Sequence, residues 1–187
     1  MALDSIVDKI IVARVGLLLR HPFFGTMATR LKIEEGGEWL PTAATDGRHI
    51  YFNRKFFEKL SVKQVEFVIA HEILHNVFDH MGRRNGREPQ LSNIAADYAV
   101  NQILKDERIG DVPSMIKIFQ DNKYRGKSYE EIYDDIYEKA EKIDISSLGD
   151  LLDEHLNDCE DDGDCEGKDN KGRPVLTEAE KKQIRDE

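Results

Sequence analysis

The first apolar stretch of the chain runs from Ile10 to Leu19 and is interrupted by Arg14. It lies within a segment that fits an amphipathic, buried helix over residues 3–20, ending before His21-Pro22. The stretch is far shorter than the roughly 20 apolar residues that span a membrane. Acidic residues precede it and no small-residue cleavage site follows, so it does not resemble an export signal. We therefore expect no membrane span and a cytoplasmic location.

Three short segments after this helix have the composition of strands. They are residues 26–34, 37–44 and 49–53. The dipeptide Asp46-Gly47 is a strong turn signal directly before the third segment, in which Tyr51 and Phe52 are good strand formers. These features predict a small three-stranded sheet.

Helical signals dominate the middle of the chain. Two capping boxes, Ser61 with Gln64 and Ser128 with Glu131, mark the start of two helices. The first of these helices is expected to continue to about His80. Two more helical segments are expected, at residues 53–60 and 92–105.

The composition changes beyond about Ile145. Residues 146–176 are rich in Asp, Glu, Gly and Asn, which is typical of a linker. Cys159 and Cys165 both lie in this stretch and do not form a disulfide framework, which suits a reducing cytoplasm. We expect one α+β domain at residues 1–145, an acidic linker at 146–176, and the truncated start of a further helix at 177–187.

The chain carries 37 acidic and 27 basic residues, a formal net charge of -10. Binding to nucleic acid requires a basic surface that can neutralise phosphates. The charge therefore argues against nucleic acid as the main partner.

The chemistry of the chain centres on His71-Glu72-Ile73-Leu74-His75. Residues four apart share one face of a helix, so His71 and His75 can bind one zinc ion. Glu72 lies beside them as a general base. Zinc lowers the pKa of its bound water to about 7, and Glu72 can then take a proton from that water.

The five-residue pattern also arises by chance, on surface helices with coincidental His and Glu residues. Here the apolar run Phe67–Ala70 precedes it, which indicates a buried helix. Buried imidazoles and carboxylates need partners, and this requirement favours a metal site.

A zinc site needs a third protein ligand, for which His80 and Asp97 are the candidates. If the helix continues, His80 points roughly 140° away from His75, because each residue turns the helix by about 100°. Asp97 lies on an almost entirely apolar segment, where an unpaired carboxylate would be costly to bury. Asp97 is therefore the preferred third ligand and His80 the alternative. A structural Asp97, bonded to a backbone group or an arginine, is the competing interpretation.

Four further polar residues have the spacing to support the metal ligands. Asp79 is four residues after His75 and is expected to orient its ring. Asn93 and Asn101 flank Asp97 at one-turn spacing and are expected to hold its carboxylate, and Tyr98 is a candidate for stabilising an oxyanion. Ordinary packing or capping is an equally good explanation for each of them.

The run from Thr45-Asp46-Gly47 through Tyr51-Phe52-Asn53 into Phe67–His75 resembles the compact zincins called minigluzincins. The continuation through His80–Arg84, Asn93–Tyr98 and Ser128–Tyr133 resembles, more specifically, the metallopeptidase domain found before von Willebrand A-like domains in bacterial and phage proteins. The resemblance covers roughly residues 1–140. Gluzincins use a downstream Glu as third ligand, where this chain offers Asp97.

This resemblance implies an α+β, zincin-like fold. A small three-stranded sheet packs on an N-terminal helix, the HExxH helix and a following ligand helix, and the strand at residues 48–53 lies near the substrate. It also implies a von Willebrand A-like domain beyond residue 187 of the parent protein.

The sequence thus predicts a zinc-dependent metallopeptidase that acts on a peptide or protein substrate. The alternative is a catalytically silent, zinc-binding interaction module of a larger assembly. An intact Glu72 favours the enzyme, because a structural site has no use for a base, and structural zinc sites favour four protein ligands.

Overall fold

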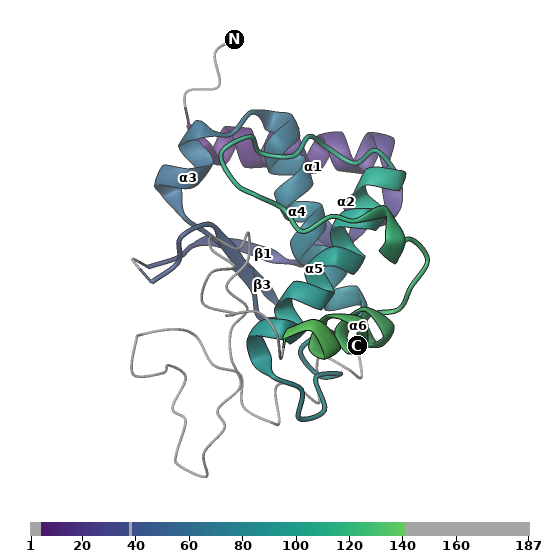
Figure 1. Ribbon diagram of the computed structural model, residues 1–187. Helices are drawn as coiled ribbons and strands as arrows, with labels where there is room; N and C mark the ends of the chain where they lie inside the picture. The colour runs from purple at the N-terminus through teal and green to yellow at the C-terminus, as the bar shows by residue number, and fades with distance from the viewer. Residues whose placement is uncertain (1–4, 38, 141–187) are drawn as a thin grey trace.

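The computed structural model describes residues 5–37 and 39–140, and this part of the chain is an α+β protein (Figure 1). It contains six α-helices, one short 3-10 helix and one three-stranded mixed sheet. The predicted linker, the segment 177–187 and both cysteines lie outside the described residues. The elements are α1 (Ile6–Arg20), α2 (Pro22–Arg30), β1 (Lys32–Glu35), β2 (Ala43–Thr45), β3 (His49–Phe52), α3 (Arg54–Lys59), α4 (Val62–Val77), α5 (Pro89–Asp106), the 3-10 helix (Asn122–Tyr124) and α6 (Tyr129–Ala140).

The sheet has the order β1-β3-β2, with β1 parallel and β2 antiparallel to the central β3. Gly47, with φ of 90°, lies in the turn between β2 and β3, as the Asp46-Gly47 signal predicts. The expected three-stranded sheet is therefore confirmed, although its strands are shorter than the expected segments. The strand β2 contacts α4, which places the sheet beside the helix that carries the histidines.

Two helices differ from the expectation, and both begin at a proline: α2 was not expected at all, and α5 begins earlier than expected. Residues 26–30 were expected to be extended but belong to α2, which starts at Pro22. The helix expected from residue 92 starts at Pro89, where the Glu88 side chain accepts from the backbone N–H groups of Gln90 and Leu91. Proline fits the first turn of a helix because the N–H that it lacks has no partner there.

The helix α4 begins as predicted and ends earlier than predicted. The capping box of Ser61 and Gln64 is present at its start. The helix ends at Val77, because Asp79 adopts a left-handed conformation with φ of 48°. Aspartate tolerates this conformation better than most residues. The expectation of a helix to His80 is therefore wrong, and the direction of the His80 side chain changes with it.

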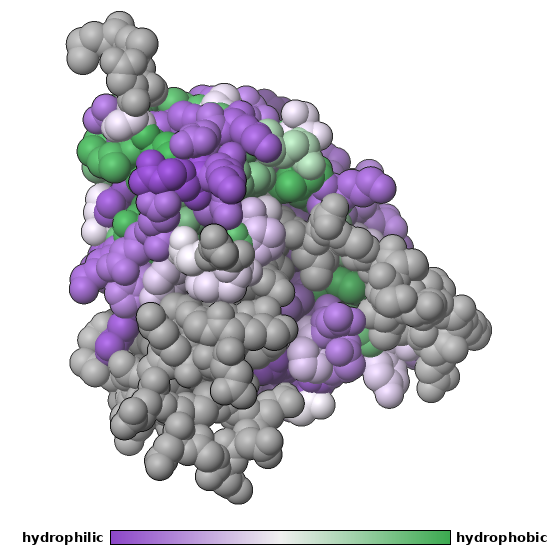
Figure 2. Space-filling view, turned by 90° about the vertical axis from the view of Figure 1, so that its left-hand side faces the viewer, coloured by the Kyte–Doolittle hydropathy of each residue, from purple (hydrophilic) through white to green (hydrophobic). Residues whose placement is uncertain are grey.

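The surface of the described residues is mixed in character. On the face that Figure 2 shows, hydrophilic residues cover most of this surface, and smaller hydrophobic areas lie between them. Within the described ranges, no helix combines the length and the apolar character that crossing a bilayer requires.

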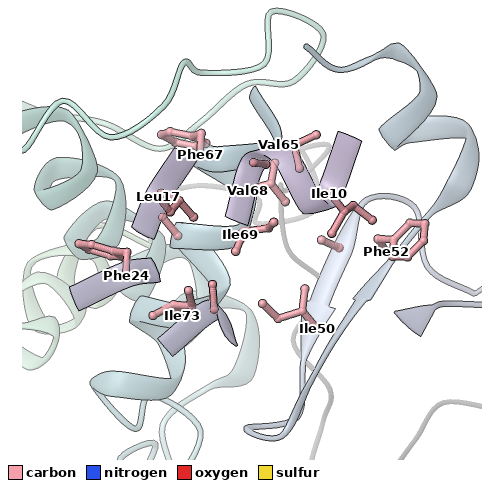
Figure 3. Close-up of a cluster of buried hydrophobic side chains, with 14 of the residues drawn as sticks. Ile10, Leu17, Phe24, Ile50, Phe52, Val65, Phe67, Val68, Ile69 and Ile73 are labelled. Atoms are coloured by element: carbon pink, nitrogen blue, oxygen red, sulfur yellow. The ribbon is translucent and has the colours of Figure 1, made fainter. Parts of the chain in front are cut away.

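The main hydrophobic core surrounds α4 (Figure 3). Ile10 and Leu17 of α1 and Ile50 of β3 pack with Val68, Ile69 and Ile73 of α4. A second, smaller cluster joins α5, the 3-10 helix and α6, and it includes Leu91, Ile94, Tyr124, Tyr129 and Ile132. The sheet and α6 lie on opposite sides of α4 and α5 (Figure 1), so the contact between these two helices is at the centre of the fold.

Candidate metal centre

Three potential ligand atoms converge where α4 faces α5. His71 and His75 have no exposed surface, and Asp97 is 1% exposed. The Nε2 atoms of the two imidazoles are 3.0 Å apart. The Oδ1 atom of Asp97 is 3.4 Å from each of them. The structure thus brings together the two histidines of the motif and the aspartate preferred from the sequence.

The His71 ring is oriented by Asn101. The Nδ2 group of Asn101 donates to the carbonyl oxygen of Phe119 at 3.1 Å. The Oδ1 atom of Asn101 therefore faces Nδ1 of His71, also at 3.1 Å. An amide oxygen only accepts, so Nδ1 carries the proton and Nε2 turns its lone pair toward His75 and Asp97. The sequence predicts Asn101 against the Asp97 carboxylate, whereas its amide bonds His71 and Phe119 instead.

The His75 ring contacts His80 on its other edge. Their Nδ1 atoms are 3.0 Å apart, and the backbone N–H of His80 donates to the His75 carbonyl at 3.2 Å. The expectation that His80 points away from His75 is wrong, because the chain turns back after Val77. His80 nevertheless lies at Nδ1 of His75, whereas Nε2 of His75 faces His71 and Asp97. His80 is therefore outside the group of three convergent ligand atoms.

Aromatic rings hold His80 in this position. The imidazole lies 5.6 Å from the Phe78 ring and 5.3 Å from the Tyr129 ring. Tyr129 shares a hydrogen bond of 2.8 Å with the hydroxyl of Ser92. Burial raises the pKa of Tyr129, so its hydroxyl stays protonated near neutral pH. The sequence offered one signal for this arrangement, an Asp residue just before His80 that can adopt a left-handed conformation.

The other predicted site residues do not belong to this group of three. Glu72 follows His71 on α4 and has no exposed surface. The Asp79 carboxylate accepts from the backbone N–H of Gly82 at 3.2 Å, while His80 occupies the place expected for Asp79 at Nδ1 of His75. The Tyr98 ring packs against Phe119 and Tyr124. Asn93 is half-buried.

The donor set fits a divalent cation. Two imidazole nitrogens and one carboxylate oxygen form a ligand set suited to zinc. Zinc bonds of about 2.0–2.1 Å in tetrahedral geometry place neighbouring ligand atoms about 3.3 Å apart. The three separations of 3.0, 3.4 and 3.4 Å are close to this value. Two imidazole lone pairs and a carboxylate at such separations repel each other unless a proton or a cation lies between them.

A family model with the description "Putative metallopeptidase domain" matches residues 7–186. No curated protein and no solved structure matches the chain.

Proposed function

The chain belongs to the "Putative metallopeptidase domain" family, and from this premise we propose that it is a zinc-dependent metallopeptidase. His71, His75 and Asp97 hold the zinc ion, and Glu72 is the general base. The observation that carries this proposal is the near-equal spacing of the three ligand atoms, which matches the edges of a zinc coordination tetrahedron.

Each residue has a defined part in peptide hydrolysis. A bound zinc ion supplies Lewis-acid polarisation of the substrate carbonyl and makes water more acidic. Glu72 is the residue after His71 on α4, so its carboxylate is beside the ligands rather than among them. It accepts the proton of the attacking water and delivers a proton to the leaving amine.

Asn101 and His80 position the two histidine ligands. The Asn101 oxygen fixes the protonated Nδ1 of His71. In the same way, Nδ1 of His80 accepts the proton on Nδ1 of His75, which leaves Nε2 of His75 available for the metal. Both ligands would then bind through Nε2, and both would be oriented by a hydrogen bond at Nδ1.

The arrangement around α4 agrees with a zincin-like fold as part of this proposal. A small sheet contacts the helix with the paired histidines, and the next long helix supplies the third ligand. We also propose that the domain works in the cytoplasm on peptides or proteins, and that its parent protein carries a von Willebrand A-like domain.

A catalytically silent zinc-binding module is the second candidate, and the burial of the site favours it. His71, His75 and Glu72 have no exposed surface, yet a substrate must reach Glu72 for hydrolysis. The enzyme therefore requires an opening of the site that a silent module would not need.

Metal content and peptide hydrolysis together test the proposed function. We expect about one zinc ion per chain by mass spectrometry of the metal, since the three ligands form one site. The zinc-loaded chain should hydrolyse peptides of a library. It should lose this activity after chelation and regain it when zinc is returned. If the chain contains iron(II) instead, the metal is iron rather than zinc, because two histidines and one carboxylate also suit that ion. A zinc-loaded chain that cleaves no peptide would favour the silent module.

Replacement of His80 tests its positioning role. His80→Ala should lower zinc affinity by about 10–100-fold, the usual effect of losing an outer hydrogen-bond partner of a ligand. His80→Asn, which keeps a hydrogen-bond acceptor, should restore part of the loss. Affinity is measured by competition with a chromogenic chelator. Val77→Ala, an exposed position at the end of α4 and three residues before His80, is the matched control. Equal zinc affinity in His80→Ala and the control would exclude the role.

A further inference from the structure

A basic pocket lies at the ends of β1 and β3 in an otherwise acidic chain. Its volume is about 420 Å³. Three cationic side chains line it, namely Arg30 at the end of α2, Lys32 at the start of β1 and Arg48 just before β3. Gly47, His49 and Asn76 complete the polar part of the lining. With a formal net charge of -10 for the chain, three cations around one hollow favour an anionic ligand.

The carboxylate nearest to this pocket in sequence, that of Asp46, already has hydrogen-bond partners on both oxygens. Oδ1 of Asp46 accepts from the backbone N–H groups of Arg48 and His49, at 2.8 and 2.6 Å. Oδ2 of Asp46 bonds His49 Nδ1 at 2.9 Å and accepts from the Tyr51 hydroxyl at 3.0 Å. Burial and the Asp46 charge both raise the pKa of Tyr51, which keeps this donor protonated. Among the described residues, no carboxylate forms an ion pair with Arg30, Lys32 or Arg48.

The pocket is connected to the candidate metal centre through α4. Asn76 follows His75 and lies one helical turn after Glu72, on the same side of the helix. Its side-chain amide bonds Thr45 of β2 at 2.9 Å, and the Thr45 hydroxyl donates to the His49 carbonyl at 2.8 Å. One helical turn is about 5.4 Å, whereas an extended peptide advances about 3.3 Å per residue. About two extended residues therefore span the separation of Glu72 and Asn76 along α4, and Asn76 lines the pocket.

We propose that this pocket binds a carboxylate of the peptide substrate, so that the enzyme selects acidic peptides. This inference rests on the proposed metallopeptidase function. The two guanidinium groups offer paired donors that match a carboxylate, and Lys32 adds a third positive charge. A Glu or Asp side chain and a C-terminal carboxylate share this chemistry, and the side chain is the expected source.

The test measures binding without hydrolysis. The full chain with Glu72→Gln is loaded with zinc and titrated calorimetrically with blocked peptides that differ only in Glu or Gln at two positions. The Glu peptide should bind about tenfold or more tightly, since hydrogen bonds to charged groups are among the stronger ones. Adding Arg30→Gln, Lys32→Gln and Arg48→Gln together should remove this preference. Adding Lys55→Gln, Lys59→Gln and Lys105→Gln, which remove equal charge from exposed positions, should keep it.

Two further probes identify the source of the anion. A Gln peptide with a free C-terminus that binds like the blocked Glu peptide would support a carboxylate pocket and assign it to the chain end. Inorganic phosphate that displaces the Glu peptide at equal concentration would overturn the peptide proposal. If the pocket variant and the charge-matched control prefer the Glu peptide equally, the pocket is not the site that binds its carboxylate.

Failure of the pocket and failure of the proposed function give different results. If the wild-type chain cleaves Glu and Gln peptides at equal rates, the metallopeptidase function is supported and the acidic selectivity is contradicted. If the chain binds Glu peptides selectively but cleaves none, the anion-binding pocket is supported and the metallopeptidase function is contradicted.

Discussion

Glu72→Gln is expected to abolish peptide hydrolysis while the chain keeps its zinc ion. The substitution keeps the shape of the side chain and removes its capacity to accept a proton. General-base catalysis contributes about 10²–10⁴-fold to rates, so kcat should fall by at least about 100-fold. The His71, His75 and Asp97 ligand atoms are untouched. Peptide hydrolysis and zinc content, both measured on the same preparation, check the two parts of this expectation.

Two outcomes would contradict the mechanism. A variant that hydrolyses peptides at the wild-type rate would show that Glu72 is not the base. A variant that loses its zinc would show that Glu72 is a ligand or that the site has collapsed, and circular dichroism would separate these two explanations. Retained zinc with lost activity is the only result that agrees with a base beside three other ligands.

Asp97→Ala is expected to reduce zinc affinity more than any substitution outside the ligand set. The change removes the carboxylate from the three proposed ligands and leaves two neutral imidazoles. The loss should exceed the roughly 10–100-fold that removal of an outer hydrogen-bond partner causes. His71→Ala and His75→Ala should behave alike. Competition with a chromogenic chelator measures all of these variants.

The matched control is Asn93→Ala, one helical turn before Asp97 on α5. Asn93 is half-buried and lies outside the group of convergent ligand atoms, so its loss should leave zinc affinity nearly unchanged. Asp97→Asn keeps the side-chain volume and removes the charge, which separates a packing defect from a lost ligand. Tight zinc binding in both Asp97 variants would make Asp97 a structural residue.

The sequence predicted best those features that depend on local spacing. The capping box of Ser61 and Gln64 located the start of α4, because its side-chain and backbone hydrogen bonds involve only neighbouring residues. The four-residue spacing of His71 and His75 placed both rings on one face, and the structure finds their Nε2 atoms together. Asp97 was singled out by an apolar helix around a single carboxylate, and it does lie against both rings.

Features that depend on one backbone angle or on distant contacts were not predictable. Pro22 is equally compatible with the end of one helix and with the first turn of the next. The end of α4 coincides with the positive φ of Asp79, after which His80 lies against His75. Asn101 could be assigned to Asp97 by spacing, but its partner is His71, thirty residues earlier in the chain. The pocket at Arg30 and Arg48 required the pairing of β1 with β3.

The position of the three proposed ligands between two hydrophobic clusters has a thermodynamic consequence. His71 and His75 belong to the helix inside the larger cluster, whereas Asp97 lies on α5 between Ala96 of the smaller cluster and Val100 of the larger one. An ion bound there is a cross-link between two cooperative units. It stabilises the native state by about 4.1 kcal/mol when free zinc is 1,000 times its Kd. Without the ion, we expect α6 and the first half of α5 to exchange their amide hydrogens well before the helices around α4.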